Sequence, residues 1–130
     1  MNGLPPPLRH AIKERLRPTV AQLVRDLVAD ELHGEAHVAP ATEVLLHRIG
    51  GMAPHLGAGM AGLTLAFDAW CRARGGPYAT LPADARLARL EEWRHLPGPL
   101  GGWSQFYEKM SVFAWWSVAE EEEAHAHAAG

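Results

Sequence analysis

Apolar residues recur at helical spacing along almost the whole chain, and this period limits the possible folds more than any other feature. In the first segment an apolar residue stands at every fourth position: Leu8, Ile12, Leu16, Val20, Val24 and Val28. Residues spaced in this way share one face of an α-helix. No stretch has the alternation typical of strands. The sequence therefore predicts an all-α fold, a single compact bundle of about five helices with a disordered C-terminal tail.

Prolines and glycines divide the periodic pattern into its helices. Pro18 interrupts the first segment, which is either two helices or one kinked helix, because proline disfavours helical geometry in the preceding residue. Residues 31–40 are expected to form a loop. Further helices are expected over residues 42–48, 54–74, 80–96 and 100–118. Residues 1–118 would then form the bundle domain, and the acidic, Ala- and His-rich residues 119–130 the tail.

The segment 54–74 has two different faces when it is drawn as a helix. One face carries a core-sized apolar stripe: Leu56, Met60, Leu63, Phe67, Trp70 and Cys71. The opposite face carries small residues: Ala58, Gly59, Gly62, Ala66 and Ala69. Small side chains permit close approach of a neighbouring helix, so this helix is expected at the centre of the bundle.

The segment 100–118 has more apolar surface than one core face requires. One arc holds the expected core residues: Leu100, Trp103, Phe106, Tyr107, Met110 and Phe113. Val112, Trp115 and Trp116 fall outside that arc and form a second apolar face near the end of the helix. Such a face is either covered by another segment of the chain or used as an interface, since tryptophan is common in both settings. These three residues are the candidate partner interface.

Eight histidines raise the possibility of a metal site. Three sets have a suggestive spacing: His33 and His37 around Glu35, Glu92 with His95, and Glu43 with His47. The first set lacks the glutamate next to the first histidine that a zincin helix needs. The second lacks the other Glu-x-x-His and the inward carboxylates of a di-iron site, and the spacing of the third is common. Surface histidines are the expected interpretation, and no metal ligand is assigned.

Residues for catalysis or cofactor binding are not evident either. The single cysteine, Cys71, is expected to be a buried, inert thiol, and the paired glycines match neither a phosphate loop nor a dinucleotide fingerprint. A net charge of −3 without a basic cluster disfavours nucleic acid and anionic membranes as partners. No signal-peptide pattern is visible, so we expect a cytoplasmic protein unless a partner carries it elsewhere.

Three stretches, in their order along the chain, resemble a known family: PTVAQLVRDLVADE, HVAPATEVLLHRIGGMAPHLGAGMAGLTLAFDAW and YATLPADARLARLEEWRHLPGPLGGWSQFYEKMSVFAWWS. They are similar to the small subunit of gluconate 2-dehydrogenase-type complexes, over roughly residues 18–117. A similar helical stretch precedes the flavin domain of long-chain alcohol oxidases. The most specific part is YATLPADARLARLEEW followed by an aromatic-rich helix ending in FAWWS.

The resemblance implies a cofactor-free accessory subunit whose partner is an FAD-dependent large subunit of the glucose–methanol–choline type. Such subunits help the flavoprotein to fold, to stay stable and, in exported complexes, to reach the periplasm. This chain lacks the twin-arginine signal of the exported members, and the family supplies no catalytic residues. Two alternatives stay open: a stand-alone bundle that binds a small hydrophobic ligand or a metal, and a self-associating helical protein.

Overall fold

A computed structural model describes residues 6–29 and 35–129 of the chain. Its elements follow one another in this order: α1 (Pro6–Val24), the π-helical turn η1 (Arg25–Ala29), the 3-10 turn η2 (Glu35–His37), α3 (Val38–Gly50), α4 (Pro54–Arg72), the 3-10 turn η3 (Tyr78–Thr80), α5 (Ala83–Arg94) and α6 (Pro99–Ala129). The described residues contain no strand. The predicted all-α bundle of about five helices is confirmed.

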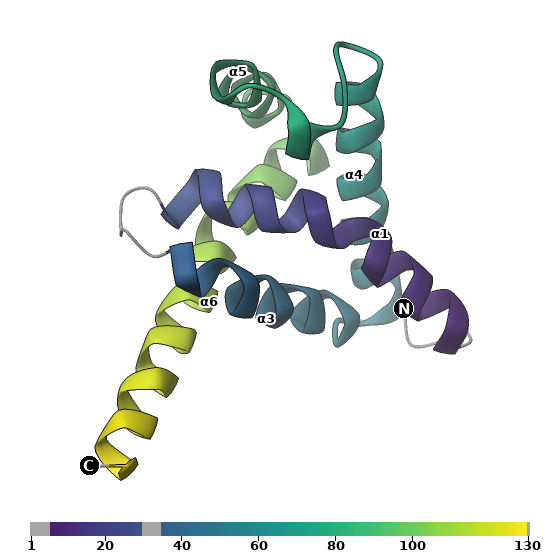
Figure 1. Cartoon of the computed structure of the whole chain (residues 1–130). Coiled ribbons are helices and arrows are strands. Elements are labelled where there is room, and N and C mark those ends of the chain that lie inside the picture. The colour runs from purple at the N-terminus through teal and green to yellow at the C-terminus, as the bar shows by residue number, and fades with distance from the viewer. Residues whose placement is uncertain (1–5, 30–34, 130) are drawn as a thin grey trace.

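The helices pack around one core, and one of them projects beyond it. In Figure 1, α1 and α3 run side by side and α6 crosses behind them. The α4 and α5 labels stand in the upper part of the view, away from the C-terminal end of α6. The last turns of α6 extend away from the bundle (Figure 1). No helix in the described part of the chain has both the length and the apolar character needed to cross a membrane.

Helix α1 passes through Pro18 as one helix and is bent in Figure 1, which decides between the two alternatives for this segment. A bend is expected there because proline removes one hydrogen bond of the helix and crowds the preceding turn. The stripe from Leu16 to Val24 is buried, as predicted, and Val28 of η1 continues it. Leu8 was expected on the same face but is exposed, because the first turns of α1 extend past their neighbours.

Helix α3 begins at Val38, within the stretch that was expected to be a loop. Pro40 lies in the first turn of α3, where backbone N–H groups have no acceptor within the helix, so a proline there breaks no hydrogen bond. The helix can therefore begin at Val38, before the expected start at residue 42. Leu45 and Ile49 of this helix are buried in the core.

An aromatic cluster joins α4, η3, α5 and α6. Phe67 is its centre, with ring centroids 5.0 Å from Tyr78, 5.1 Å from Trp93 and 4.7 Å from Trp103. Thr64 ties α4 to α6 by hydrogen bonds, because its hydroxyl accepts from the Trp103 indole at 3.0 Å and lies 2.8 Å from the Tyr107 hydroxyl. Both tryptophans and both tyrosines of these contacts are buried.

Helix α4 lies at the edge of the bundle, which corrects its expected central position. The small residues of its predicted packing face are exposed: Ala58, Gly59, Gly62, Ala66 and Ala69. A methyl group added at Gly59 or Gly62 would meet no atom within 4 Å. Leu56, expected in the core, is exposed. The buried side instead includes Thr64 and Asp68, whose polar groups have partners inside the fold, and apolar periodicity alone does not register such residues.

Helix α6 continues to Ala129, well beyond the end that was expected near Val118. The residues after Val118 are mainly alanine and glutamate, which favour helix, and no glycine or proline intervenes before Gly130. Glu120 to Ala126 are exposed, so this extension stands outside the core.

Candidate functional site: an exposed apolar patch on α6

Three large apolar side chains lie next to one another on the exposed side of α6. Val112, Phe113 and Trp116 are 42%, 51% and 50% exposed, and together they are called the α6 patch here. Phe113 and Trp116 follow Val112 by one and four positions, so the three side chains lie on one side of the helix. The opposite side is buried: Trp103, Tyr107, Ser111, Ala114, Trp115 and Val118. The patch is therefore surface that the described core does not use.

Two of the three predicted interface residues, Val112 and Trp116, are exposed, but Trp115 is not. Trp115 is only 8% exposed, because His37 of η2 lies against it with ring centroids 5.0 Å apart. Of the two alternatives for the second apolar face, Trp115 shows the first: it is covered by another segment of the chain and is not an exposed interface residue. Residues 31–40 were expected to be a loop, and no pattern in them indicated that part of this stretch crosses this face of α6.

Phe113 was expected in the core and is instead half exposed. The guanidinium of Arg48 lies 5.6 Å from the centre of its ring. Phe113 also borders a shallow groove of about 320 Å³ against α3, which Val44 and His47 line from the other side. The patch thus meets a groove between α3 and α6, and Phe113 is the functional candidate that sequence reasoning missed.

One rotation explains both errors on α6. The observed buried face is turned by roughly 60° from the predicted arc, at about 100° per residue. Ser104, Ser111 and Ala114 occupy the buried face because small side chains allow α6 to approach the rest of the bundle closely. Counting large apolar residues alone favoured Met110 and Phe113 over these small ones. The same rotation of the buried face places Trp115 in the core and Phe113 outside it.

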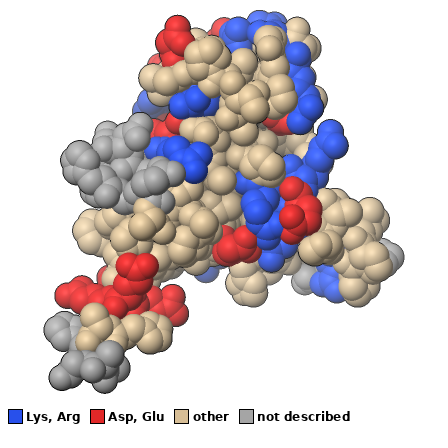
Figure 2. Space-filling view, viewed as in Figure 1, with Lys and Arg blue, Asp and Glu red and all other residues tan. Residues whose placement is uncertain are grey.

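Acidic side chains follow the patch along α6. Glu120 to Glu123 begin four residues after Trp116, and Figure 2 shows the acidic side chains gathered on the projecting end of the helix. One of them, Glu122, forms a hydrogen bond with His37, whose Nε2 lies 2.8 Å from the carboxylate. The patch therefore has a strongly acidic border on its C-terminal side.

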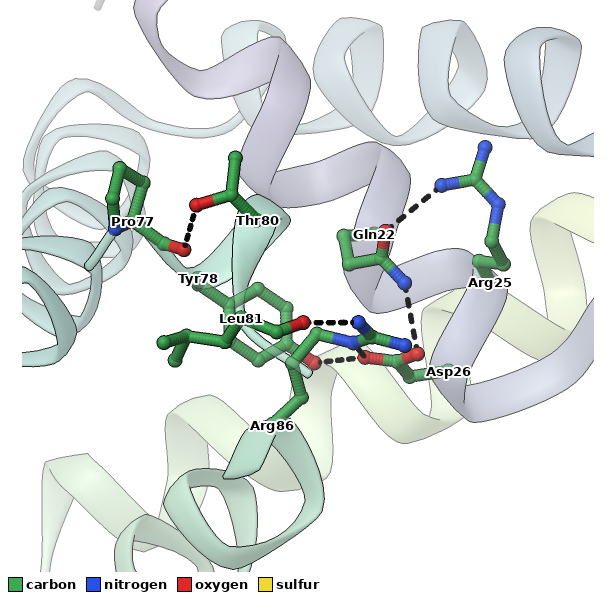
Figure 3. A network of polar contacts seen from close by, with 8 residues as sticks. All are labelled: Gln22, Arg25, Asp26, Pro77, Tyr78, Thr80, Leu81 and Arg86. Carbon is green, nitrogen blue, oxygen red and sulfur yellow. Dashed lines mark hydrogen bonds and ion pairs between the residues drawn. The ribbon is translucent and has the colours of Figure 1, made fainter. Parts of the chain in front are cut away.

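A second notable group is a buried polar cluster around Asp26 of η1 (Figure 3). One oxygen of Asp26 accepts hydrogen bonds from the Tyr78 hydroxyl at 2.5 Å and from Arg86 Nε at 2.9 Å. The other oxygen accepts from Gln22 at 2.9 Å. Arg86 also donates to the carbonyl of Leu81 at 2.5 Å. These contacts join α1, η1, η3 and α5.

The Asp26 cluster has the features of a structural clamp. Tyr78 is fully buried, and burial together with the adjacent carboxylate raises the pKa of its phenol well above the usual range. Its proton therefore stays on the oxygen and is donated to Asp26. The side chains of Asp26 and Arg86 are 6% and 17% exposed, which leaves little room for a substrate to reach them. The cluster fixes η1 and α5 in place rather than offering an acid–base pair.

The histidine sets singled out in the sequence are dispersed into separate ion pairs. His95 pairs with Glu91 at 2.7 Å rather than with Glu92. Glu43 is paired with Arg17 at 2.7 Å, although it borders the same groove as His47. His33 lies outside the described residues. Within 6–29 and 35–129, no three His, Cys, Asp or Glu side chains are grouped as metal ligands would be.

Cys71 is buried, as predicted. Burial and the nearby Asp68 carboxylate raise the pKa of its thiol to about 11. Thiolate is the reactive form of cysteine, so this side chain is poorly suited to nucleophilic chemistry near neutral pH.

Comparisons of the chain with protein-family models, curated proteins and solved structures found no match. The α6 patch and the resemblance seen in the sequence are the two observations that bear on function.

Proposed function

We propose that this chain is a non-catalytic accessory subunit that binds an FAD-dependent large subunit of the glucose–methanol–choline type through the α6 patch. The observation that carries the proposal is the group of three half-exposed side chains, Val112, Phe113 and Trp116. Small soluble proteins rarely leave neighbouring large apolar side chains in water without a use, and such patches often mark protein interfaces.

The geometry of the patch suits a protein partner. Trp116 follows Phe113 by three positions and Val112 by four. A helix that presents apolar side chains at these spacings can lie in an apolar groove of another protein. Tryptophan and arginine are frequent among the residues that dominate binding energy, and Trp116 and Arg48 both belong to this surface. Exposed charges, including Lys109 and Glu120, would form the polar rim.

The type of partner is inferred from the resemblance. Its most specific part ends in FAWWS, which contains Phe113 and Trp116 of the patch. The preceding motif, YATLPADARLARLEEW, contributes the buried Tyr78 and Trp93, which support the bundle. A role in stabilising the flavoprotein, in the cytoplasm, belongs to the same proposal.

Co-expression with a glucose–methanol–choline-type flavoprotein from the same organism tests the proposal directly. The two proteins should co-purify, and Trp116→Ala should weaken their association by about 2 kcal/mol or more if Trp116 is an anchor residue. Leu56→Ala is the matched control, because Leu56 is similarly exposed but lies on α4. Failure to co-purify, or equal effects of both variants, would contradict the proposed interface.

Self-association through the same patch is distinguished by measuring the size of the isolated chain across a dilution series. A dimer that dissociates on dilution and is lost in Trp116→Ala would favour a symmetric homodimer over the flavoprotein complex. A monomer at all concentrations leaves the patch available for a different partner.

A further inference from the structure

A cavity of about 390 Å³ lies between the end of α1, α5 and α6, apart from the α6 patch. Leu23 and Leu27 line it from the α1 side, Leu90 from α5, and Trp103 and Tyr107 from α6. Its volume is near the lower end of the range of about 300–1,000 Å³ found for small-molecule sites. A cavity of this size and lining can hold a small organic molecule.

The aromatic walls present ring surfaces rather than polar groups. The indole N–H of Trp103 donates to Thr64 at 3.0 Å, and the Tyr107 hydroxyl lies 2.8 Å from the same Thr64 oxygen. The polar ends of both side chains are therefore occupied by Thr64 of α4, which does not line the cavity. Together with the three leucines, they make the interior of the cavity apolar.

The charged residues at the cavity already have partners. Arg94 lies 3.4 Å from Glu108 and 3.9 Å from Glu91, and Glu91 is also 2.7 Å from His95. A charged ligand would meet positive and negative side chains that already form ion pairs with one another. This arrangement favours an uncharged ligand.

One polar side chain of the cavity has no such partner. Ser104 is 6% exposed and lines the cavity, and its Oγ is buried without a hydrogen-bond partner in the described part of the chain. A buried polar group without a partner costs free energy. The Oγ is covered in the unliganded fold, so the Ser104 side chain must turn to another staggered rotamer before a ligand hydroxyl or carbonyl can hydrogen-bond to it. Leu87 of α5, which is exposed, also lines the cavity and marks its outer side.

We propose that this cavity binds a small uncharged molecule with an apolar body and one hydroxyl or carbonyl group, and that the Ser104 side chain turns on binding so that its Oγ hydrogen-bonds to that group. The apolar body would lie against Leu23, Leu27 and the ring faces of Trp103 and Tyr107. The proposal does not depend on the flavoprotein partner, because every residue it uses belongs to the chain itself. It can be tested on the isolated full chain.

Titration with 2-naphthol and naphthalene, followed by the methyl NMR signals of Leu23, Leu27 and Leu90, is the primary test. The two probes share one apolar body and differ by a single hydroxyl. We expect saturable shifts of these methyl signals with both probes and tighter binding of 2-naphthol. Absence of saturable shifts with both probes would overturn the proposal.

Two substitutions on α5 locate the binding. Ala88→Phe places a large side chain at the cavity, whereas Ala83→Phe makes the same change at an exposed position that does not line it. Binding of both probes should be lost in Ala88→Phe and retained in Ala83→Phe. If binding survives Ala88→Phe unchanged, the probes occupy another place and the proposal is wrong.

Ser104→Ala tests the hydrogen bond itself. Loss of a single neutral hydrogen bond should lower the affinity for 2-naphthol by about three- to tenfold and leave that for naphthalene unchanged. The thermal melt and the methyl spectrum of the unliganded variant verify that it is folded. An unchanged preference for 2-naphthol would contradict the assigned role of Ser104.

Discussion

Trp115 and Trp116 are neighbours in the sequence and pack edge to face, with ring centroids 5.0 Å apart and planes at 82°, yet only Trp116 is exposed. Successive residues of a helix point about 100° apart, so one of the pair can belong to the core while the other faces the surface. Trp115 is held between the core and His37. It therefore gives Trp116 a firm support, which would reduce the ordering cost when a partner binds.

Replacement of the two tryptophans should separate stability from assembly. Trp115→Ala should lower the free energy of unfolding of the isolated chain by about 3–5 kcal/mol, because it leaves a cavity beneath η2. Trp116→Ala should lower it by less than about 1 kcal/mol and should act mainly on assembly. Urea unfolding followed by circular dichroism measures both values. Equal destabilisation by the two changes would mean that Trp116 is also covered in solution.

Gly101 and Gly102 offer a matched test of the packing where α6 begins. A Cβ added at Gly101 would lie 2.6 Å from the backbone oxygen of Leu96, whereas one at Gly102 would meet nothing within 4 Å. Gly101→Ala should therefore destabilise the chain by about 1–3 kcal/mol through forced backbone movement. Gly102→Ala should be neutral or stabilising by up to about 1 kcal/mol, because alanine favours helix. Thermal melts that give the reverse order would show that α6 does not start against Leu96.

The class of fold could be predicted from the sequence because periodicity and helix-breaking residues are local signals. Helix ends were harder, since α3 starts before residue 42 and α6 continues past Val118. The position of such an end depends on whether the flanking residues, which tolerate helical geometry, gain tertiary contacts or extend the helix through their own helix propensity. The edge position of α4 was also missed, because the use of a small-residue face depends on which helix happens to lie opposite.

The candidate site could be located to the end of α6 but not to its individual residues. Val112 and Trp116 were identified, while Trp115 and Phe113 exchanged places. Their true environments depend on η2 crossing Trp115 and on small serines at the helix contact, neither of which apolar periodicity records. The ligand cavity was also missed, since its lining comes from three segments distant in the sequence.

The Asp26 clamp should be important for stability. Arg86→Leu would leave the Asp26 carboxylate buried without its charged partner and should cost about 3–5 kcal/mol of unfolding free energy. Arg94→Leu is the matched control, because its ion pairs are exposed and worth about 0–1 kcal/mol. Urea unfolding of both variants at neutral pH gives the comparison. Similar small losses in both would show that the clamp is open to water.

Alkaline pH should destabilise the fold. Burial raises the pKa of Cys71 to about 11 and raises the pKa values of Tyr78 and Tyr107 above their usual range. Because the folded state retains these protons longer than the unfolded state, the contribution of these three groups to stability is constant below about pH 8.5–9 and falls as the pH rises beyond it. Urea midpoints between about pH 7 and 10.5 measure this fall. Cys71→Ala should make the fall shallower in its first part, and a flat profile in the unmodified chain would contradict the burial of these groups.

The end of α6 should be separable from the stability of the bundle. Glu120 to Ala126 are exposed, and Glu122 in this stretch pairs with His37 of η2 at 2.8 Å. An exposed pair contributes about 0–1 kcal/mol, and a short exposed helical extension frays readily in water. Truncation after Ala119 should therefore change the free energy of unfolding by less than about 1 kcal/mol.

Hydrogen exchange gives the second measurement on this extension, whose disorder in solution stays a prediction. Amides after Glu120 should exchange much faster than those of Tyr107 to Ala114, which lie in the part of α6 packed on the core. Glu122→Gln serves as the matched change, since it alters the His37 contact and leaves the length of the helix intact. If truncation instead costs more than about 2 kcal/mol and Glu122→Gln reproduces much of that loss, the extension holds η2 over Trp115. The acidic run would then be part of the bundle rather than a tail beyond it.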